Sequence, residues 1–355
     1  MLKEYFRGIA EVTERVDARE ESFYSTLEEF IKRFADSIGK KNLYITTLPK
    51  KTEAGNPDFR VWDGKQKIIG YIEAKKLTED NLDHIETTEQ LERYRKTFPN
   101  LILTDFLEFR LYRDGELRDK VTLAHPPSFT PAELERAYSS ETEKELFNLL
   151  ESFMDFSLPP KYDAKSLAVE LAKRTRFLKE QVIIEELKEE KAEEDGFIHG
   201  FYDAFKTYLI FDLTKEAFAD LYAQTITYGL FAARTRSGDE FNRKLAYDYI
   251  PGTIGILRDV FKFISLGDLP IQMEWIVDDI SEVLSVADVN QILHKFYHEG
   301  KGSDPIIHFY ETFLAEYNPE ERERRGVYYT PEPVVSYIVR SLDIILKEKF
   351  GKADG

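Results

Sequence analysis

The stretch PDFRVWDGKQKIIGYIEAKK, residues 57–76, decides the fold expected for this chain of 355 residues. Two runs rich in β-forming residues, 59–62 and 68–74, flank the dipeptide Asp63-Gly64, which is a strong signal for a β-hairpin turn. The second run is apolar or small on both of its faces, which is typical of a central strand. The sequence therefore predicts a hairpin whose second strand lies inside a sheet.

Three charged side chains stand near one end of this hairpin. Because side chains alternate along a strand, Glu73 and Lys75 point to the same face. Asp58 stands at the start of the partner strand, close enough across the hairpin to share a divalent cation with Glu73. Two carboxylates and a lysine on rigid strands suit phosphodiester hydrolysis with Mg²⁺. The alternative is an amphipathic hairpin whose charged face meets water.

The pattern resembles the PD-(D/E)XK nuclease motif, with Asp58, Glu73 and Lys75 in its three named places. The resemblance implies a restriction-endonuclease-like mixed sheet with flanking helices. It also implies that Asp58, Glu73 and the backbone carbonyl of Ala74 bind Mg²⁺, for which Mn²⁺ can substitute. In such a site Lys75 positions the attacking water, and the substrate is double-stranded DNA.

A helix is expected from Glu20 to Phe34, because apolar residues recur there at helical spacing. Its start, ESFY at residues 21–24, resembles the Glu-x-x-Tyr start of the first helix in fused restriction-modification enzymes. That resemblance implies that Glu21, rather than Glu28, is a further metal ligand. The alternative for either residue is a solvated helix face. No element is expected in residues 1–19, and a strand is expected in residues 42–48.

A second helix is expected to begin after Thr88, a residue type favoured as an N-cap. Gln90 and Tyr94 are four residues apart and therefore share a face of this helix. The pair resembles the Gln-x-x-x-Tyr element of one branch of these nucleases, which implies that both residues face the DNA. Two ordinary amphipathic positions are the alternative. Strands follow in residues 100–105 and 107–113, with a returning strand to Leu123, which completes a mixed α/β domain.

Composition limits the classes of protein that remain. The formal net charge of −17 is opposite to that of a protein that coats DNA, so any basic contacts must be local. The absence of cysteine excludes disulfides and thiolate chemistry, and fits a cytoplasmic protein. No apolar run reaches the length of a membrane span, so no membrane partner is expected.

After the linker SLPPK, residues 157–161, nearly every segment has helical periodicity. The sequence therefore predicts an all-α domain, with an apolar central helix at residues 218–233. Its other helices are expected at residues 164–191, 253–266, 272–284, 289–296 and 305–317. His294 and His298 have a metal-ligand spacing but lack the glutamate of a zinc protease, so they are interpreted as surface residues.

The string GVYYTPEPVV, residues 326–335, is the second informative stretch, with Thr330 as the cap of a helix that runs to about Phe350. It resembles the segment before the first strand of N6-adenine DNA methyltransferases. That resemblance implies that Tyr328, Tyr329 and Thr330 contact S-adenosylmethionine in a full-length parent enzyme. The Gly-rich cofactor loop and the Asn/Asp-Pro-Pro-Tyr motif of that family do not occur in this sequence.

The chain as a whole resembles the front of a single-polypeptide restriction-modification enzyme of the type IIG/IIL kind. The expected division is a nuclease at 1–156, a helical connector at 157–325 and a first methyltransferase segment at 326–355. The expected function is metal-dependent DNA cleavage, without the methyltransferase and target-recognition parts. Two other hypotheses remain open: a catalytically silent scaffold that connects those parts to the nuclease, and a methyltransferase remnant that binds the cofactor.

Overall fold

The structure is a computed structural model of the chain. It describes residues 1–15, 17–48, 56–64, 67–77, 82–124, 130–159, 161–188, 197–238, 240–250, 255–267, 269–298, 305–320 and 332–352.

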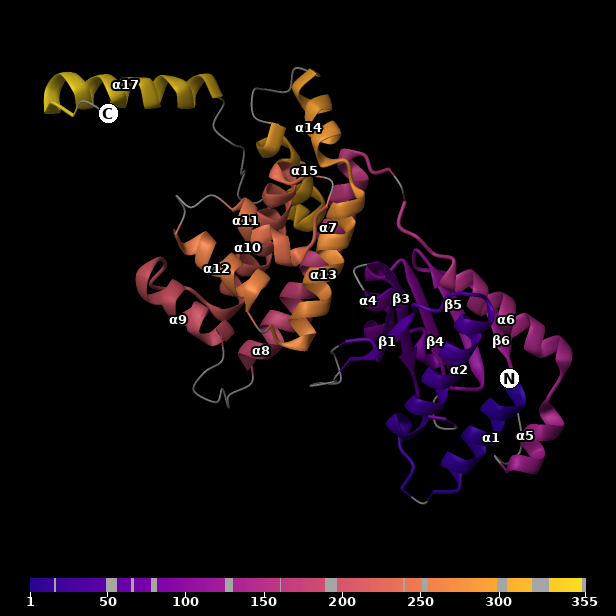
Figure 1. The fold of residues 1–355 in the computed structure, drawn as a ribbon. Coiled ribbons are helices and arrows are strands. Elements are labelled where there is room, and N and C mark those ends of the chain that lie inside the picture. The colour runs from indigo at the N-terminus through magenta and orange to yellow at the C-terminus, as the bar shows by residue number, and fades with distance from the viewer. Residues whose placement is uncertain are drawn as a thin grey trace.

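A six-stranded mixed sheet forms the first part of the chain, with its strands in sequential order (Figure 1). Only the neighbours β3 and β4 run parallel; the other neighbouring pairs are antiparallel. The predicted hairpin is present, with Gly64 at a φ of 75° and the N–H of Asp63 donating to the carbonyl of Lys67. The strands are β1 Tyr44–Thr47, β2 Phe59–Trp62, β3 Ile68–Ala74, β4 Asn100–Thr104, β5 Glu108–Arg113 and β6 Glu116–Thr122.

The helices that accompany the sheet include one that the sequence analysis did not expect, α1. It forms because Leu2, Tyr5, Phe6 and Ile9 recur on one face and are buried, although no side chain caps its start. Residues 131–154 form two helices rather than one, because Ser139 caps a new start. These helices are α1 Leu2–Thr13, α2 Tyr24–Ser37, α3 Leu82–Ile85, α4 Glu89–Thr97, α5 Pro131–Ala137 and α6 Ser140–Met154, with a 3₁₀ turn η1 at Glu20–Phe23.

The second part is helical, as predicted, and α10 at its centre is buried along most of its length. The helix expected over residues 164–191 runs as α7, a π-helical segment and α8, as far as Lys188. The helices are α7 Ala164–Phe177, η2 Leu178–Ile183, α8 Ile184–Lys188, α9 Phe197–Tyr208, α10 Lys215–Arg236, η3 Arg243–Leu245, α11 Ala246–Tyr249, α12 Gly255–Leu266, α13 Ile271–Val286, α14 Val289–His298, α15 Pro305–Tyr317 and α17 Glu332–Phe350.

The two faces of the sheet contribute to different cores. One face, with Ile72 and Ile102, packs with α1, α2 and α6. The other face, with Tyr71 and Leu103, belongs to a core that also contains residues of α4, α7 and α13. The sheet is thus covered on both sides, which is why β3 and β4 carry almost no exposed side chain.

An aromatic cluster joins the helical part to the sheet. The ring of Trp275 on α13 lies 5.4 Å from Tyr71 of β3, 5.7 Å from Phe98 and 5.3 Å from Phe177, as ring-centroid distances. Trp275 is 1% exposed. Burial of a residue of this size dominates the local packing energy, so we expect this cluster to be the main apolar contact between the two parts.

Candidate active site

Asp58 stands immediately before β2, at the end of the hairpin away from its turn. The β2–β3 register pairs Phe59 with Ile72, so one step further places Asp58 opposite Glu73. One carboxylate oxygen, Oδ2, accepts a hydrogen bond of 2.7 Å from the backbone N–H of Ala74. Asp58 and Glu73 are both 0% exposed. Two buried carboxylates therefore stand side by side at the end of β3.

Lys75 continues from β3 and connects the strand to α4. Its Nζ lies 2.6 Å from Oε1 of Glu73 and donates to Oε1 of Gln90 at 3.3 Å. The amide nitrogen of Gln90 then donates to the hydroxyl of Tyr94 at 3.2 Å. Four of the residues selected from the sequence are thus joined in one hydrogen-bonded chain, which runs from Glu73 to Tyr94.

The orientation of α4 brings Gln90 and Tyr94 to this chain. Thr88 caps the helix as predicted, because its hydroxyl accepts from the N–H of Leu91 at 3.3 Å. Burial and the nearby Glu73 carboxylate raise the pKa of Tyr94 well above its ordinary value. The Tyr94 hydroxyl therefore keeps its proton at neutral pH, as a neutral hydrogen-bonding group beside the carboxylates.

Glu21 is not brought to Asp58; its side chain is exposed in η1. Its neighbour Glu20 is the acidic residue near the site, because the hydroxyl of Tyr24 lies 2.7 Å from Oε1 of Glu20 and 2.5 Å from Oδ1 of Asp58. The sequence pattern included Tyr24 as the last residue of the Glu-x-x-Tyr string without a role in the site, and did not select Glu20. Their i, i+4 spacing, which places both on one helix face, was the signal that could have found them.

The oxygen atoms present are of the kind that Mg²⁺ prefers. Within the described ranges, no group of three or more carboxylate and imidazole side chains could hold a metal ion. A Mg²⁺ site needs fewer than three such side chains, since Mg²⁺ usually binds one or two carboxylates and keeps several waters. Asp58, Glu73 and the carbonyl of Ala74 make such a set, so the residues fit the predicted metal, although Lys75 and Ala74 N–H hold these carboxylates in the present arrangement.

Several sequence predictions concern residues outside the described ranges. Tyr328, Tyr329 and Thr330, expected to contact S-adenosylmethionine, are among them. The side chain of His298 also lies outside the description.

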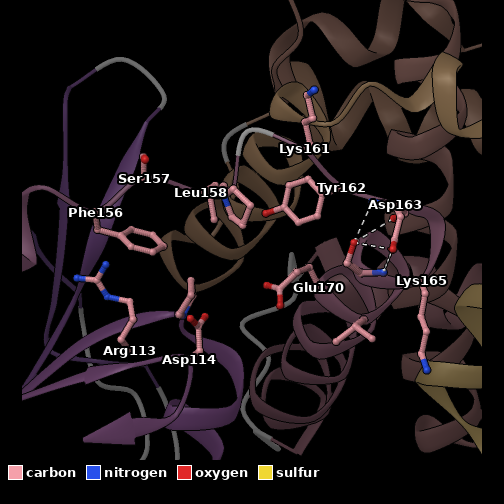
Figure 2. Close-up of a pocket in the computed structure, with 14 residues that line it drawn as sticks. Arg113, Asp114, Phe156, Ser157, Leu158, Lys161, Tyr162, Asp163, Lys165 and Glu170 are labelled. Carbon is pink, nitrogen blue, oxygen red and sulfur yellow. Dashed lines mark hydrogen bonds between the residues drawn. The ribbon is translucent and has the colours of Figure 1, made fainter. Parts of the chain in front are cut away.

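A cavity of about 620 Å³ lies away from these residues, beside the 157–159 linker (Figure 2). Figure 2 shows the ring of Phe156 facing it from the sheet side, and Tyr162 and Glu170 facing it from the helical side. At its rim Asp163 caps α7, because its carboxylate accepts from the N–H of Ser166 at 2.7 Å. None of the predicted site residues lines this cavity, so it marks a hollow in the junction rather than the candidate active site.

Comparison with known proteins assigns no family. No protein-family model and no curated protein matches the chain. Among solved structures, one match is the cryoEM structure of a DrdV–DNA complex, with 20% sequence identity and a TM-score of 0.33. The match covers 98% of this chain and 32% of that one, so the chain spans about a third of that protein's length. Among the described helices, none is long and apolar enough to cross a membrane.

Proposed function

We propose that this chain is the metal-dependent DNA endonuclease portion of a combined restriction-modification enzyme. The observation that carries the proposal is the contact chain Glu73–Lys75–Gln90–Tyr94, with Asp58 hydrogen-bonded to the backbone next to Glu73. A solvated hairpin face, the alternative from the sequence, would leave these carboxylates in water. Instead both are fully buried and held by rigid elements.

Hydrolysis of a DNA phosphodiester forms a bond from a water oxygen to phosphorus and breaks the bond from phosphorus to one deoxyribose oxygen; the water gives up a proton and the leaving oxygen takes one up. When bound, Mg²⁺ would supply Lewis-acid polarisation of the phosphate. Lys75 would orient the water and offset the negative charge that develops on the phosphate oxygens. Glu73 and Gln90 hold its ammonium group in place, and Gln90 and Tyr94 would shape the side of the site that meets double-stranded DNA.

A combined enzyme would also contain a methyltransferase part and a target-recognition part. The resemblance at residues 326–335 supports a methyltransferase that binds S-adenosylmethionine, with Tyr328, Tyr329 and Thr330 at the cofactor. A target-recognition part would supply DNA affinity. With a net charge of −17, this chain alone should bind DNA weakly and in a salt-sensitive way.

A second candidate function is a catalytically silent connector, and one observation favours it. α17 projects from the helical part (Figure 1), and its apolar side chains are exposed. Among them are Val334, Val335, Tyr337, Ile338, Val339, Leu342, Ile344, Ile345 and Phe350. A helix with so much exposed apolar surface is suited to contact a further protein part. Nuclease activity separates the two candidates.

The decisive experiment measures plasmid nicking with Mg²⁺ or Mn²⁺, together with Mn²⁺ binding by calorimetry. We expect the parent chain to nick DNA without sequence specificity, and Asp58→Ala to lose both Mn²⁺ binding and nicking. Lys75→Ala should keep Mn²⁺ binding but lose about a hundredfold or more in nicking rate, because it acts on the water and the developing charge.

The matched controls remove an aspartate and a lysine at exposed positions away from the site. Asp155→Ala removes a carboxylate that is paired with Lys40 on the surface, and Lys96→Ala removes an exposed lysine of α4. Both variants should keep the activity of the parent. Nicking by Asp58→Ala at the parent rate would show that this hairpin is not the active site and would favour the connector function.

A further inference from the structure

The hydroxyl of Tyr24 lies between two carboxylates. Its oxygen is 2.5 Å from Oδ1 of Asp58 and 2.7 Å from Oε1 of Glu20. The ring is 9% exposed and packs against Phe59, at a centroid distance of 4.7 Å. It also lies 6.5 Å from the ring of Phe106. The hydroxyl is therefore held by a buried ring rather than by a freely rotating surface side chain.

Local structure explains why Glu20 and Tyr24 meet. Glu20 opens the 3₁₀ turn η1, which leads directly into α2 at Tyr24. The turn is closed by a hydrogen bond of 3.0 Å from the N–H of Arg19 to the hydroxyl of Ser22. Residues four apart lie one above the other on a helical face, so the Glu20 carboxylate reaches the Tyr24 hydroxyl while Glu21 points to solvent.

The two oxygens of Asp58 have different partners. Oδ1 faces the Tyr24 hydroxyl, and Oδ2 accepts from the N–H of Ala74 at 2.7 Å. Contacts from two different elements, one at each oxygen, help to fix the plane of the carboxylate group. A tyrosine hydroxyl carries a single proton. That proton can be donated to only one of the two carboxylates at a time, and the shorter contact is the one to Asp58; the hydroxyl also lies between the two like charges.

We propose that Tyr24 is a positioning residue of the candidate active site: it orients the Asp58 carboxylate and separates it from Glu20. The inference rests on the proposed function, because it assigns Tyr24 a role in a metal-dependent nuclease. Tyr24 itself touches neither the metal nor the DNA. Its effect passes through Asp58, as that of outer hydrogen-bond partners does in other metal sites.

The test is Tyr24→Phe, which removes one oxygen atom and keeps the ring. We expect Mn²⁺ affinity, measured by calorimetry, to fall about 10- to 100-fold. The rate constant kcat for nicking should fall, while KM for DNA stays unchanged. The double variant Tyr24→Phe/Glu20→Gln should recover part of the Mn²⁺ affinity, because it removes the repulsion and supplies an amide donor beside Asp58.

A purely structural role is distinguished by Tyr5→Phe. Tyr5 is another buried tyrosine, on α1, whose hydroxyl donates to the carbonyl of Phe106 at 2.8 Å. This control should lower the stability measured by urea unfolding but keep Mn²⁺ affinity. If Tyr24→Phe behaves like Tyr5→Phe, or if Glu20→Gln recovers nothing in the double variant, Tyr24 is not a positioning residue.

If the proposed nuclease function is wrong, the results differ from those expected when only the role of Tyr24 is wrong. In that case the parent chain itself would bind no Mn²⁺ and would not nick DNA. The positioning role is then decided by metal-free crystal structures of the parent and of Tyr24→Phe. A reoriented Asp58 carboxylate in the variant supports the inference, and an Asp58 carboxylate that keeps its orientation overturns it.

Discussion

The carboxylate of Glu282 on α13 accepts a hydrogen bond of 2.7 Å from the backbone N–H of Ile68, the first residue of β3. The same strand ends beside Asp58 and contains Glu73. On β2, Arg60 lies 3.6 Å from Asp278 of the same helix. α13 thus contacts both strands of the hairpin, β3 at its first residue and β2 at Arg60.

The surroundings of Glu282 predict how stability depends on pH. Burial, reinforced by the neighbouring Asp279 carboxylate, raises the pKa of Glu282 to about 8. Ile68 N–H, Arg174 and Arg60 act in the opposite direction. Since the unfolded chain has the ordinary glutamate pKa of 4.5, the folded state binds more protons between pH 4.5 and 8. The stabilisation that protonated Glu282 contributes is therefore fully present below pH 4.5 and is lost as the pH rises to about 8.

Glu282→Gln should remove this pH dependence, because the amide does not ionise and its oxygen can still accept from Ile68. Urea unfolding at pH 5.5 and pH 8.5 measures the effect, which for one proton is at most roughly 1.4 kcal/mol per pH unit. The parent should lose more stability than the variant over this interval. Glu348→Gln, on the exposed α17, is the control and should match the parent. Equal losses in the parent and in Glu282→Gln would contradict the prediction.

Gln90 is expected to matter for activity more than for stability. Its side chain joins Lys75 to Tyr94 at 3.3 and 3.2 Å. Gln90→Ala leaves the Lys75 ammonium less well oriented, so we expect nicking to fall about tenfold, a typical cost of misplacing a catalytic group. Urea unfolding should change little, because the residue is only partly buried. Gln291→Ala, an exposed residue of α14, is the matched control. Unchanged nicking by Gln90→Ala would remove Gln90 from the site.

Limited proteolysis should cut at residues 157–161, the linker predicted from the sequence, or in the charged stretch at residues 190–196. The aromatic contacts of Trp275 predict that the pieces stay associated after the cut. Size-exclusion chromatography of the cut protein should show one peak with both pieces. In a Trp275→Ala variant, which loses a large buried side chain, the pieces should separate. Preferred cutting inside residues 42–123, with the linker intact, would count against the predicted domain boundaries.

The sequence by itself determined the features that depend on neighbouring residues. Alternation and turn chemistry in residues 57–76 predicted the hairpin and the burial of β3, and Thr88 predicted the start of α4. Helical periodicity predicted most of the longer helices after residue 161, but not α9. Glu73 and Lys75 could be selected together because a strand places residues two apart on one face. Each of these inferences depends only on residues that are close to one another in the sequence.

The tertiary structure decided what comes together across long distances in the chain. Tyr24 meets Asp58 across 34 residues, and Glu282 meets Ile68 across 214. Glu20 and Glu21 point in directions that differ by about 120° around the 3₁₀ turn, so only the packing of the folded chain selects Glu20. The apolar residues of α1 also share one face, and only the folded structure shows that this face is buried. Local periodicity specifies which side chains share a surface, and only the folded chain specifies which surfaces meet.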